Sequence, residues 1–428
     1  MKVLRIGLCG LLGFSVLAHG VVEAWSVAAL EIGAALLFLY WTVVFYRDAE
    51  AQVQWSALNW PIVGFMAISL GQLMFGATAY PFLTREALLK LAAYFIFFFL
   101  AAQAFRGRAD LTRLLWFLIL LGFSVSLLGI AQHFTSPTEI YWFRRLPAGG
   151  DPFGPYVNRN HFAGFVELVA PVALSLIVFR GLRRDLFLMA GVLAIVPIGA
   201  LILSGSRGGI VGFAFEVGVL TLLARSRRGR EGPRIGAIAI VALAAIALIV
   251  WLGVGRTIER FSTLHPGDVT LSRRYTMFRG AGHIFRDHVL SGAGLGTLVS
   301  VYPRYETYYD GKLIDHVHND YIETLAETGV LGGICGLVFL GILFRQTQKT
   351  FRAEQGHFSR GLHAAAITAL AGLLLHSVVD FNLHIPSNVL LFLLQAYLAT
   401  SPALPSEGPP PVRRRSRSSE TVASEVAG

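Results

Sequence analysis

The stretch DHVHNDYIETLAETGVLGG, residues 315–333, gathers two histidines and four carboxylates within thirteen residues, directly before a glycine-rich apolar run. Because imidazole exchanges a proton near neutral pH, His318 is a candidate general base, or a hydrogen-bonding group for a substrate. His316, Asp315 and Asp320 add further types of metal ligand. Alternate histidines project together only from an extended strand, however, and this segment enters a helix. We therefore predict no metal site and no cofactor.

A second polar stretch, HSVVDFNLHIPSN at 376–388, places His376 and Asp380 one helical turn apart at the end of an apolar run. An ionisable pair at membrane depth indicates a functional site by default. A purely structural histidine–aspartate hydrogen bond is the alternative, and the sequence leaves both open. Asp380 is accordingly a candidate substrate-binding residue.

A third stretch, GPYVNRNHFAG at 154–164, begins another apolar run. His161 and Asn158 stand at its start and could line the same cavity as the residues above. Glu167 lies two turns further along, where a carboxylate is costly unless it is paired or hydrated.

The elements that must position these residues are apolar helices. The chain of 428 residues is 54% hydrophobic and 14% charged, with a mean hydropathy of +0.60, which is not the composition of a soluble globular protein. Its apolar runs of about 17–23 residues match the length that crosses a hydrocarbon core of about 30 Å. We predict an all-α polytopic membrane protein with about twelve transmembrane helices, over residues 6–22, 24–46, 58–76, 87–105, 112–133, 161–179, 185–204, 208–224, 235–254, 326–344, 361–379 and 386–399.

The distribution of charge orients these spans. If the N-terminus is cytoplasmic, 22 of the 36 basic residues fall on the cytoplasmic side, most of these in short connections, as the positive-inside rule requires. Both termini are then inside. We expect residues 1–400 to form the membrane domain and the basic segment 401–428, rich in Pro, Ser and Arg, to be a disordered cytoplasmic tail. The net charge of +10 thus reflects contact with a lipid bilayer and predicts no nucleic-acid partner.

The remaining basic residues are concentrated on the predicted outer face, in the two long loops 134–160 and 255–318, the second between spans nine and ten. Arginine binds phosphate oxygens through a planar, permanently charged fork, so the cluster favours an anionic ligand. For any single arginine, a lipid headgroup or an acid of the same loop is an equally good partner.

Within the second loop, residues 272–290 have the pattern of an amphipathic helix lying along the outer surface. Its apolar positions are Met277, Phe278, Ala281, Ile284 and Phe285, and its polar face carries Arg279, His283 and Arg286. SGAGLGT at 291–297 then breaks the pattern with glycines, which permit a tight turn and close backbone approach. A further helix is predicted to begin at Asp320, which has Glu323 three residues on in capping-box spacing. The glycines from Gly329 onward predict close helix packing.

These motifs resemble the O-antigen ligase family, which includes O-antigen ligases and related O-antigen and exopolysaccharide polymerases. His318-Asn319, nine residues and then Gly329-Val-Leu-Gly332 match the family pattern His-[Asn/Ser/Gln]-x9-Gly-x-x-Gly. Three other stretches are also similar to the family: GPYVNRNHFAG, LSGSRGG at 203–209 and LSGAGLGT at 290–297. The family-like catalytic region spans about residues 154–344.

The resemblance implies an inverting, metal-independent glycosyltransferase at the periplasmic face of the bacterial inner membrane. Such enzymes transfer a glycan from undecaprenyl pyrophosphate to an acceptor hydroxyl, here the lipid A–core of lipopolysaccharide or a growing polysaccharide. The implied catalytic residues are His318, Arg207 and Arg274, with the arginines stabilising the leaving pyrophosphate. The candidate substrate-binding residues are Arg159, Arg273, Asn319, Asn158, His161, Arg279 and Asp380.

Two alternatives to lipid A–core ligation remain. One is polymerisation of O-antigen or exopolysaccharide repeat units, an activity of the same superfamily that the sequence does not separate from ligation. The other is a transporter of lipid-linked sugar. The chain lacks the two-halves repeat and the matched pair of glycine- or proline-broken spans that many secondary transporters carry, which argues against transport.

Overall fold

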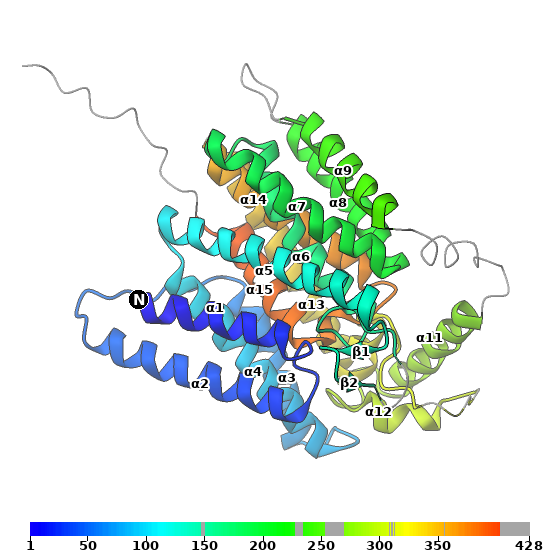
Figure 1. The fold of residues 1–428 in the computed structure, drawn as a ribbon. Helices are drawn as coiled ribbons and strands as arrows, with labels where there is room; N and C mark the ends of the chain where they lie inside the picture. Colours follow the sequence, from blue (N-terminus) through cyan, green and yellow to red (C-terminus); the bar gives the residue numbers. More distant parts are fainter. Residues whose placement is uncertain are drawn as a thin grey trace, which may run out of the picture.

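A computed structural model describes residues 1–146, 150–226, 234–252, 269–307, 309, 311, 313–354 and 356–402 of the chain. Within these ranges most of the chain is helical, and the long helices lie side by side in one bundle (Figure 1). The bundle contains α1 (Lys2–Leu17), α2 (Ala24–Tyr46), α3 (Asn59–Met74), α4 (Pro81–Ala104), α5 (Arg108–Thr135), α6 (Arg159–Val178), α7 (Arg184–Ser204), α8 (Arg207–Arg225), α9 (Gly236–Leu252), α13 (Asp320–Ala353), α14 (His357–His376) and α15 (Pro386–Thr400).

The smaller elements gather at one end of this bundle, which we call the loop end (Figure 1). They are the two-stranded antiparallel hairpin of β1 (Glu139–Ile140) and β2 (Arg144–Arg145), the helices α11 (Val269–Asp287) and α12 (Leu298–Val301), and the 3-10 turns η1 (Tyr302–Arg304) and η2 (Asn382–His384).

Each of the twelve predicted spans falls on a helix of the bundle. In the described ranges, eight helices are long and apolar enough to cross a membrane, namely α2, α4, α5, α6, α7, α8, α13 and α14. The other four have 15 to 17 residues, fewer than the roughly 20 that a straight crossing needs. The structure thus supports a helical membrane protein, and the number of twelve crossings stays a prediction.

Helix α6 lies at the centre of the bundle. The apolar window of α6 is completely buried, and the helix packs against α14, α7, α5, α8 and α15. Its carboxylate Glu167 is fully buried and accepts a hydrogen bond from His376 on α14, with 2.8 Å between Oε2 and Nδ1. The expectation that this carboxylate needs a partner is therefore confirmed.

The amphipathic helix of the second loop is α11. Met277, Ala281 and Ile284 are buried against a small apolar cluster that includes Tyr302 and Val317, whereas Arg279, His283 and Arg286 are exposed. The sequence predicted the polar face and these three apolar positions from their helical spacing, whereas the other two predicted apolar residues, Phe278 and Phe285, are only half-buried.

Two details at the start of α13 differ from the expectation. The N-cap is Asn319 rather than Asp320, and its Oδ1 accepts hydrogen bonds from the backbone of Tyr321 and Ile322. Asn319 caps the helix because the Asp320 carboxylate instead contacts the His384 ring and accepts a hydrogen bond from the backbone amide of Leu383.

Gly329 breaks α13 instead of packing it against a neighbouring helix. Its φ of +63° lies in the left-handed region, and a Cβ there would collide with the backbone of Leu290 and Gly292. The glycine loop 291–297 therefore approaches another backbone segment closely.

Several predicted features lie outside the described residues. They include residues 403–428 of the basic tail and the part of the second loop that covers residues 253–268, with Arg256 and Arg260, and Lys312.

Candidate functional site at the loop end

His318 meets Asp380 at the loop end, although 62 positions separate them in the sequence. His318 precedes α13, and Asp380 lies in the turn between α14 and η2; their Nδ1 and Oδ1 atoms are 3.3 Å apart. Two backbone-directed contacts hold these segments together: the amide of Asp320 donates to the carbonyl of Ser377, and Asn319 Nδ2 donates to the carbonyl of Val378. The pairing is therefore built by the segments on both sides of each residue.

The Asp380 carboxylate is 1% exposed and collects several donors. Asn160 Nδ2 donates to its Oδ2 at 2.5 Å, and the backbone amide of Phe381 donates to its Oδ1 at 2.9 Å. Arg274 Nη2 lies 4.0 Å from Oδ2, and His161 Nε2 lies 3.8 Å from Oδ1. Hydrogen-bond donors and positive charge are thus concentrated around the two carboxylate oxygens of Asp380.

The same surroundings keep Asp380 ionised. Burial alone raises the pKa of a carboxyl group, but the hydrogen bond from His318 and the nearby His161 and His376 outweigh it and hold the pKa of Asp380 well below its ordinary value. An ionised carboxylate only accepts hydrogen bonds, so His318 Nδ1 must be the donor. The Nε2 atom of a neutral His318 then carries the lone pair, on a side chain that is 27% exposed.

The phenyl ring of Phe381 contacts three histidine rings. Ring centroids lie 4.3 Å from His316, which is stacked on it, 4.6 Å from His161 and 4.9 Å from His318, both edge-on. Because each imidazole rests against the same rigid apolar ring, their orientations are fixed relative to one another.

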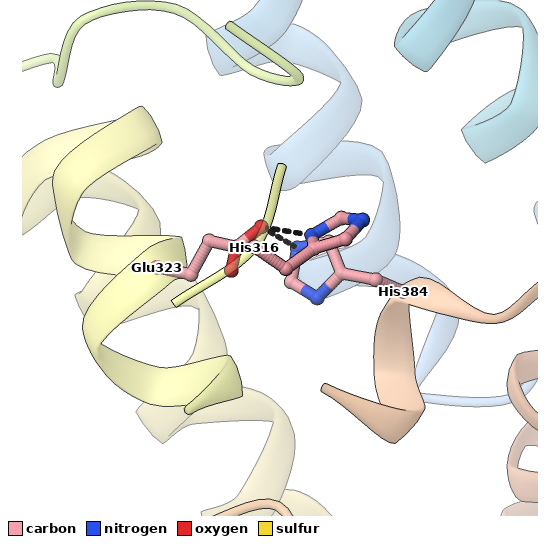
Figure 2. A group of neighbouring side chains, drawn as sticks. All are labelled: His316, Glu323 and His384. Atoms are coloured by element: carbon pink, nitrogen blue, oxygen red, sulfur yellow. Dashed lines mark hydrogen bonds and ion pairs between the residues drawn. The ribbon is translucent and has the colours of Figure 1, made fainter. Parts of the chain in front are cut away.

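A second group of ionisable residues lies next to the first. His316 and His384 both meet the Glu323 carboxylate of α13 (Figure 2), with His316 Nδ1 2.6 Å and His384 Nε2 3.3 Å from Oε1. The other nitrogen of His384, Nδ1, lies 2.7 Å from Asp320 Oδ1. Burial lowers the pKa of His384, but Glu323, Asp320 and Glu327 outweigh it and raise the pKa to about 10.

The two nominated catalytic arginines both lie at this end of the bundle. Arg274 is the cation beside Asp380 described above. Arg207 is the first residue of α8, whose N-cap Ser206 accepts a hydrogen bond from the amide of Gly209. The next residue, Gly208, packs on His376 and Val379, since a Cβ there would lie 2.6 Å from His376 Nε2. The start of α8 thus abuts the turn that carries Asp380.

Other nominated residues have local partners. Arg159 is ion-paired with Asp151 of the first loop, and Asn158 caps α6 by accepting from the amide of Asn160. Arg273 precedes Arg274 on α11, and Arg279 is exposed more than one turn further along the same helix. In the hairpin, Arg144 pairs with Glu23 and Arg145 with Glu139. Arg144, Arg145 and Arg159 therefore each have an acidic partner, which is the alternative to binding an anionic ligand.

One alternative for histidine pairing is corrected. His376 does not pair with Asp380, its neighbour one turn away, but with Glu167, because the chain leaves the helix after His376 and turns Asp380 toward His318. His316 and His318 contact different carboxylates, those of Glu323 and Asp380.

Sequence reasoning missed Asn160 and His384. Both stand inside the quoted motifs, NRNHFAG and HSVVDFNLHIPSN, and the signal that could have found them is their position. Each lies within four residues of a nominated polar residue, in a stretch where the apolar pattern is interrupted.

Comparison with known proteins covers the middle of the chain. No curated protein matches it. Residues 190–337 match the family model described as O-Antigen ligase, and this segment contains Arg207, Arg274 and the motif from His318 to Gly332. The match confirms the resemblance first seen in that motif: over residues 190–337, this chain is similar to the O-antigen ligase family.

Proposed function

We propose that the protein is a membrane glycosyltransferase that moves a glycan from undecaprenyl pyrophosphate onto an acceptor hydroxyl at the periplasmic face of the bacterial inner membrane. The family match supports a function of the O-antigen ligase or polymerase type in general. The eight long apolar helices support membrane insertion. The proposed orientation, with both termini cytoplasmic, rests on the distribution of basic residues.

The observation that carries this proposal is the His318–Asp380 pair with Arg274 beside it. Asp380 holds the Nδ1–H of His318, so Nε2 is available to accept the proton of an acceptor hydroxyl. The hydroxyl oxygen then forms a bond to the anomeric carbon while the bond from that carbon to the pyrophosphate oxygen breaks. The electron pair leaves with the lipid pyrophosphate, and a single displacement of this kind inverts the anomeric configuration.

The leaving pyrophosphate needs positive charge where its negative charge develops. Arg274 and Arg207 are the proposed source, with Arg273 and Arg279 along the same helix as Arg274 available to bind the phosphates before reaction. No step of this displacement needs a metal ion, because guanidinium groups supply the charge.

Lipid A–core is the proposed acceptor, and elongation of a second donor molecule is the alternative within the same chemistry. The test uses the full chain purified in detergent with EDTA, an undecaprenyl pyrophosphate-linked glycan, and both acceptors in competition. Glycan transfer to lipid A–core that is lost in His318→Ala supports ligation. Elongated donor glycan with the same dependence supports the polymerase.

The transporter remains the competing class. Reconstituted vesicles separate the two classes, because a transporter moves the lipid-linked glycan between leaflets without changing its covalent structure. Movement without product would refute the proposed enzyme, whereas full transfer activity in His318→Ala would refute His318 as its catalytic base.

A further inference from the structure

We propose that His316 Nδ1, Glu323 Oε1 and His384 Nε2 form a binding site for a divalent transition-metal ion of the zinc class. The three ligand atoms lie within 4.8 Å of one another, and the side chains converge from three separate segments (Figure 2). These segments are the loop before α13, the first turn of α13 and the turn η2. The sequence predicts no such site, because His384 reaches Glu323 only through the fold.

The distances from Glu323 Oε1 to the two imidazole nitrogens are close to what such an ion requires. A tetrahedral ion with bonds of about 2.0–2.2 Å holds its ligand atoms roughly 3.3–3.6 Å apart. His384 Nε2 and Glu323 Oε1 are already at 3.3 Å. His316 Nδ1 stands 2.6 Å from the same oxygen and has to withdraw by less than about 1 Å. Its side chain is 27% exposed and lies in a loop, so this adjustment is local.

A second observation points to a ligand: the outer partners of two of the three side chains, His384 and Glu323. Histidines that bind metal usually give their other nitrogen to a carboxylate or a carbonyl, which orients the ring. Asp320 does this for His384, at 2.7 Å from Nδ1, and its second oxygen accepts the amide of Leu383 at 3.0 Å. Glu323 Oε2 is likewise occupied by the amide of Val317 at 3.0 Å, which leaves Oε1 facing the two imidazoles.

The donor set selects the kind of ion. Two imidazoles and one carboxylate are the ligands of many zinc sites that keep a fourth position for water or substrate. Calcium and magnesium instead favour oxygen ligands alone. The ion would tie the segment 313–319, α13 and η2 together, whereas His318 points to Asp380 and keeps its own role. The expected effect of the ion is therefore on stability, and the proposed glycosyl transfer does not depend on it.

The test measures the metal directly. The full chain in detergent is stripped with EDTA, equilibrated with Zn²⁺, separated from free ion and analysed by mass spectrometry for bound zinc. About one equivalent per chain is expected, with a higher unfolding temperature and, after Co²⁺ loading, a visible spectrum of tetrahedral coordination. Asp320→Asn should weaken Zn²⁺ binding roughly 10- to 100-fold, as loss of an outer-shell partner does.

Two variants remove a ligand, His384→Ala and Glu323→Gln, and both should lose the bound zinc. His283→Ala is the matched control, because His283 is an exposed histidine on the polar face of α11. Size-exclusion profiles show which variants are folded, and Glu323→Gln and Asp320→Asn keep the test valid where His384→Ala is not. Zinc retained equally by all variants, or no zinc in the wild type, overturns the site. Transfer activity in the same EDTA-treated sample reports on the proposed function separately.

Discussion

Two histidine–carboxylate groups lie side by side at the loop end, one around Asp380 and one around Glu323. They differ in how many imidazole nitrogens have a carboxylate partner. In the Glu323 group, both nitrogens of His384 face carboxylates. In the Asp380 group, His318 uses Nδ1 alone, and among the described residues no hydrogen bond reaches its Nε2. Both groups are anchored by the same Phe381 ring.

This difference indicates two separate roles for polar residues that lie close together in the sequence. A partly exposed ring with a lone pair can take a proton from a substrate, whereas a ring held on both sides by carboxylates holds the surrounding segments in place. The arginine Arg274 also belongs only to the Asp380 group. We therefore propose that the Asp380 group carries out the chemistry and that the Glu323 group, with its proposed metal ion, holds the surrounding segments together.

The largest expected effect is on transfer in His318→Ala. Loss of the proton acceptor should lower the rate of glycan transfer by roughly 10²- to 10⁴-fold, the usual contribution of general acid–base catalysis. Some stability should be lost as well, because the buried Asp380 carboxylate loses a hydrogen-bond donor, and size-exclusion profiles show whether the variant is folded. The measurement is transfer kinetics in detergent with His283→Ala as the control, and retained activity in His318→Ala would move the chemistry to another residue.

Asp380→Asn tests whether the carboxylate orients His318. An amide can present its N–H₂ to Nδ1, which favours the wrong tautomer, so transfer should fall by roughly 10²-fold. The rate constant for transfer should fall more than the affinity for the donor. A change in donor affinity alone would instead assign Asp380 to substrate binding.

The stability difference between the wild type and Asp380→Asn should depend on pH. Because the folded protein holds the pKa of Asp380 below its unfolded value of about 3.9, the ionised carboxylate stabilises the fold fully above that pH. This contribution is lost as the pH falls toward the folded pKa. The difference in unfolding temperature between wild type and Asp380→Asn should therefore be largest near neutral pH and shrink below about pH 4. A difference independent of pH would show that charge is not what Asp380 contributes.

Arg274→Lys tests whether Arg274 acts through its positive charge alone or also through the geometry of its guanidinium group. Lysine keeps the positive charge but loses the planar fork that binds two phosphate oxygens. Transfer should fall by roughly tenfold, about the effect of 1.4 kcal/mol on the barrier. Arg286→Lys, an exposed position on the same helix, is the matched control, and equal losses in both variants would place the phosphate elsewhere.

The smallest effect on transfer is expected for Glu323→Gln. The variant removes the charge-assisted hydrogen bonds to His316 and His384, so the free energy of unfolding should drop by about 2 kcal/mol. The transfer rate should stay within about tenfold of the wild type, because His318 keeps Asp380. Denaturation and kinetics on one preparation check this, and a large rate loss at unchanged stability would exchange the roles of the two groups.

The parts of the molecule that local sequence determines were predictable. The apolar runs indicate the bundle helices, and the spacing of Met277, Ala281 and Ile284 indicates the buried face of α11. His318 and Asp380 were each nominated, the first from its motif and the second from its place at the end of a helix.

Their contact was not predictable, because it depends on how the start of α13 docks against the turn after α14. The same holds for His384, a single histidine in an apolar stretch whose partners, Asp320 and Glu323, lie more than sixty positions earlier. The capping residue was misplaced by one position for a similar reason, since Asp320 is recruited by a distant histidine. Local rules indicate which residues are polar and where helices begin, and tertiary contacts decide which polar atoms they meet.

The break at Gly329 makes part of the second loop inseparable from a helix of the bundle. Past the break, the amides of Val330 and Leu331 donate to the carbonyls of Val289 and Leu290, at 2.8 and 3.2 Å. In return, the amides of Ala293 and Gly294 donate to the carbonyls of Ala326 and Glu327.

Each of these backbone groups has its partner in the other segment, so neither segment has its hydrogen bonds completed without the other. The loop is thus not a module that can be transplanted between relatives. A chimera that exchanges residues 288–297 has to carry the first turns of α13 with them, and recombination points belong either before α11 or beyond Leu331.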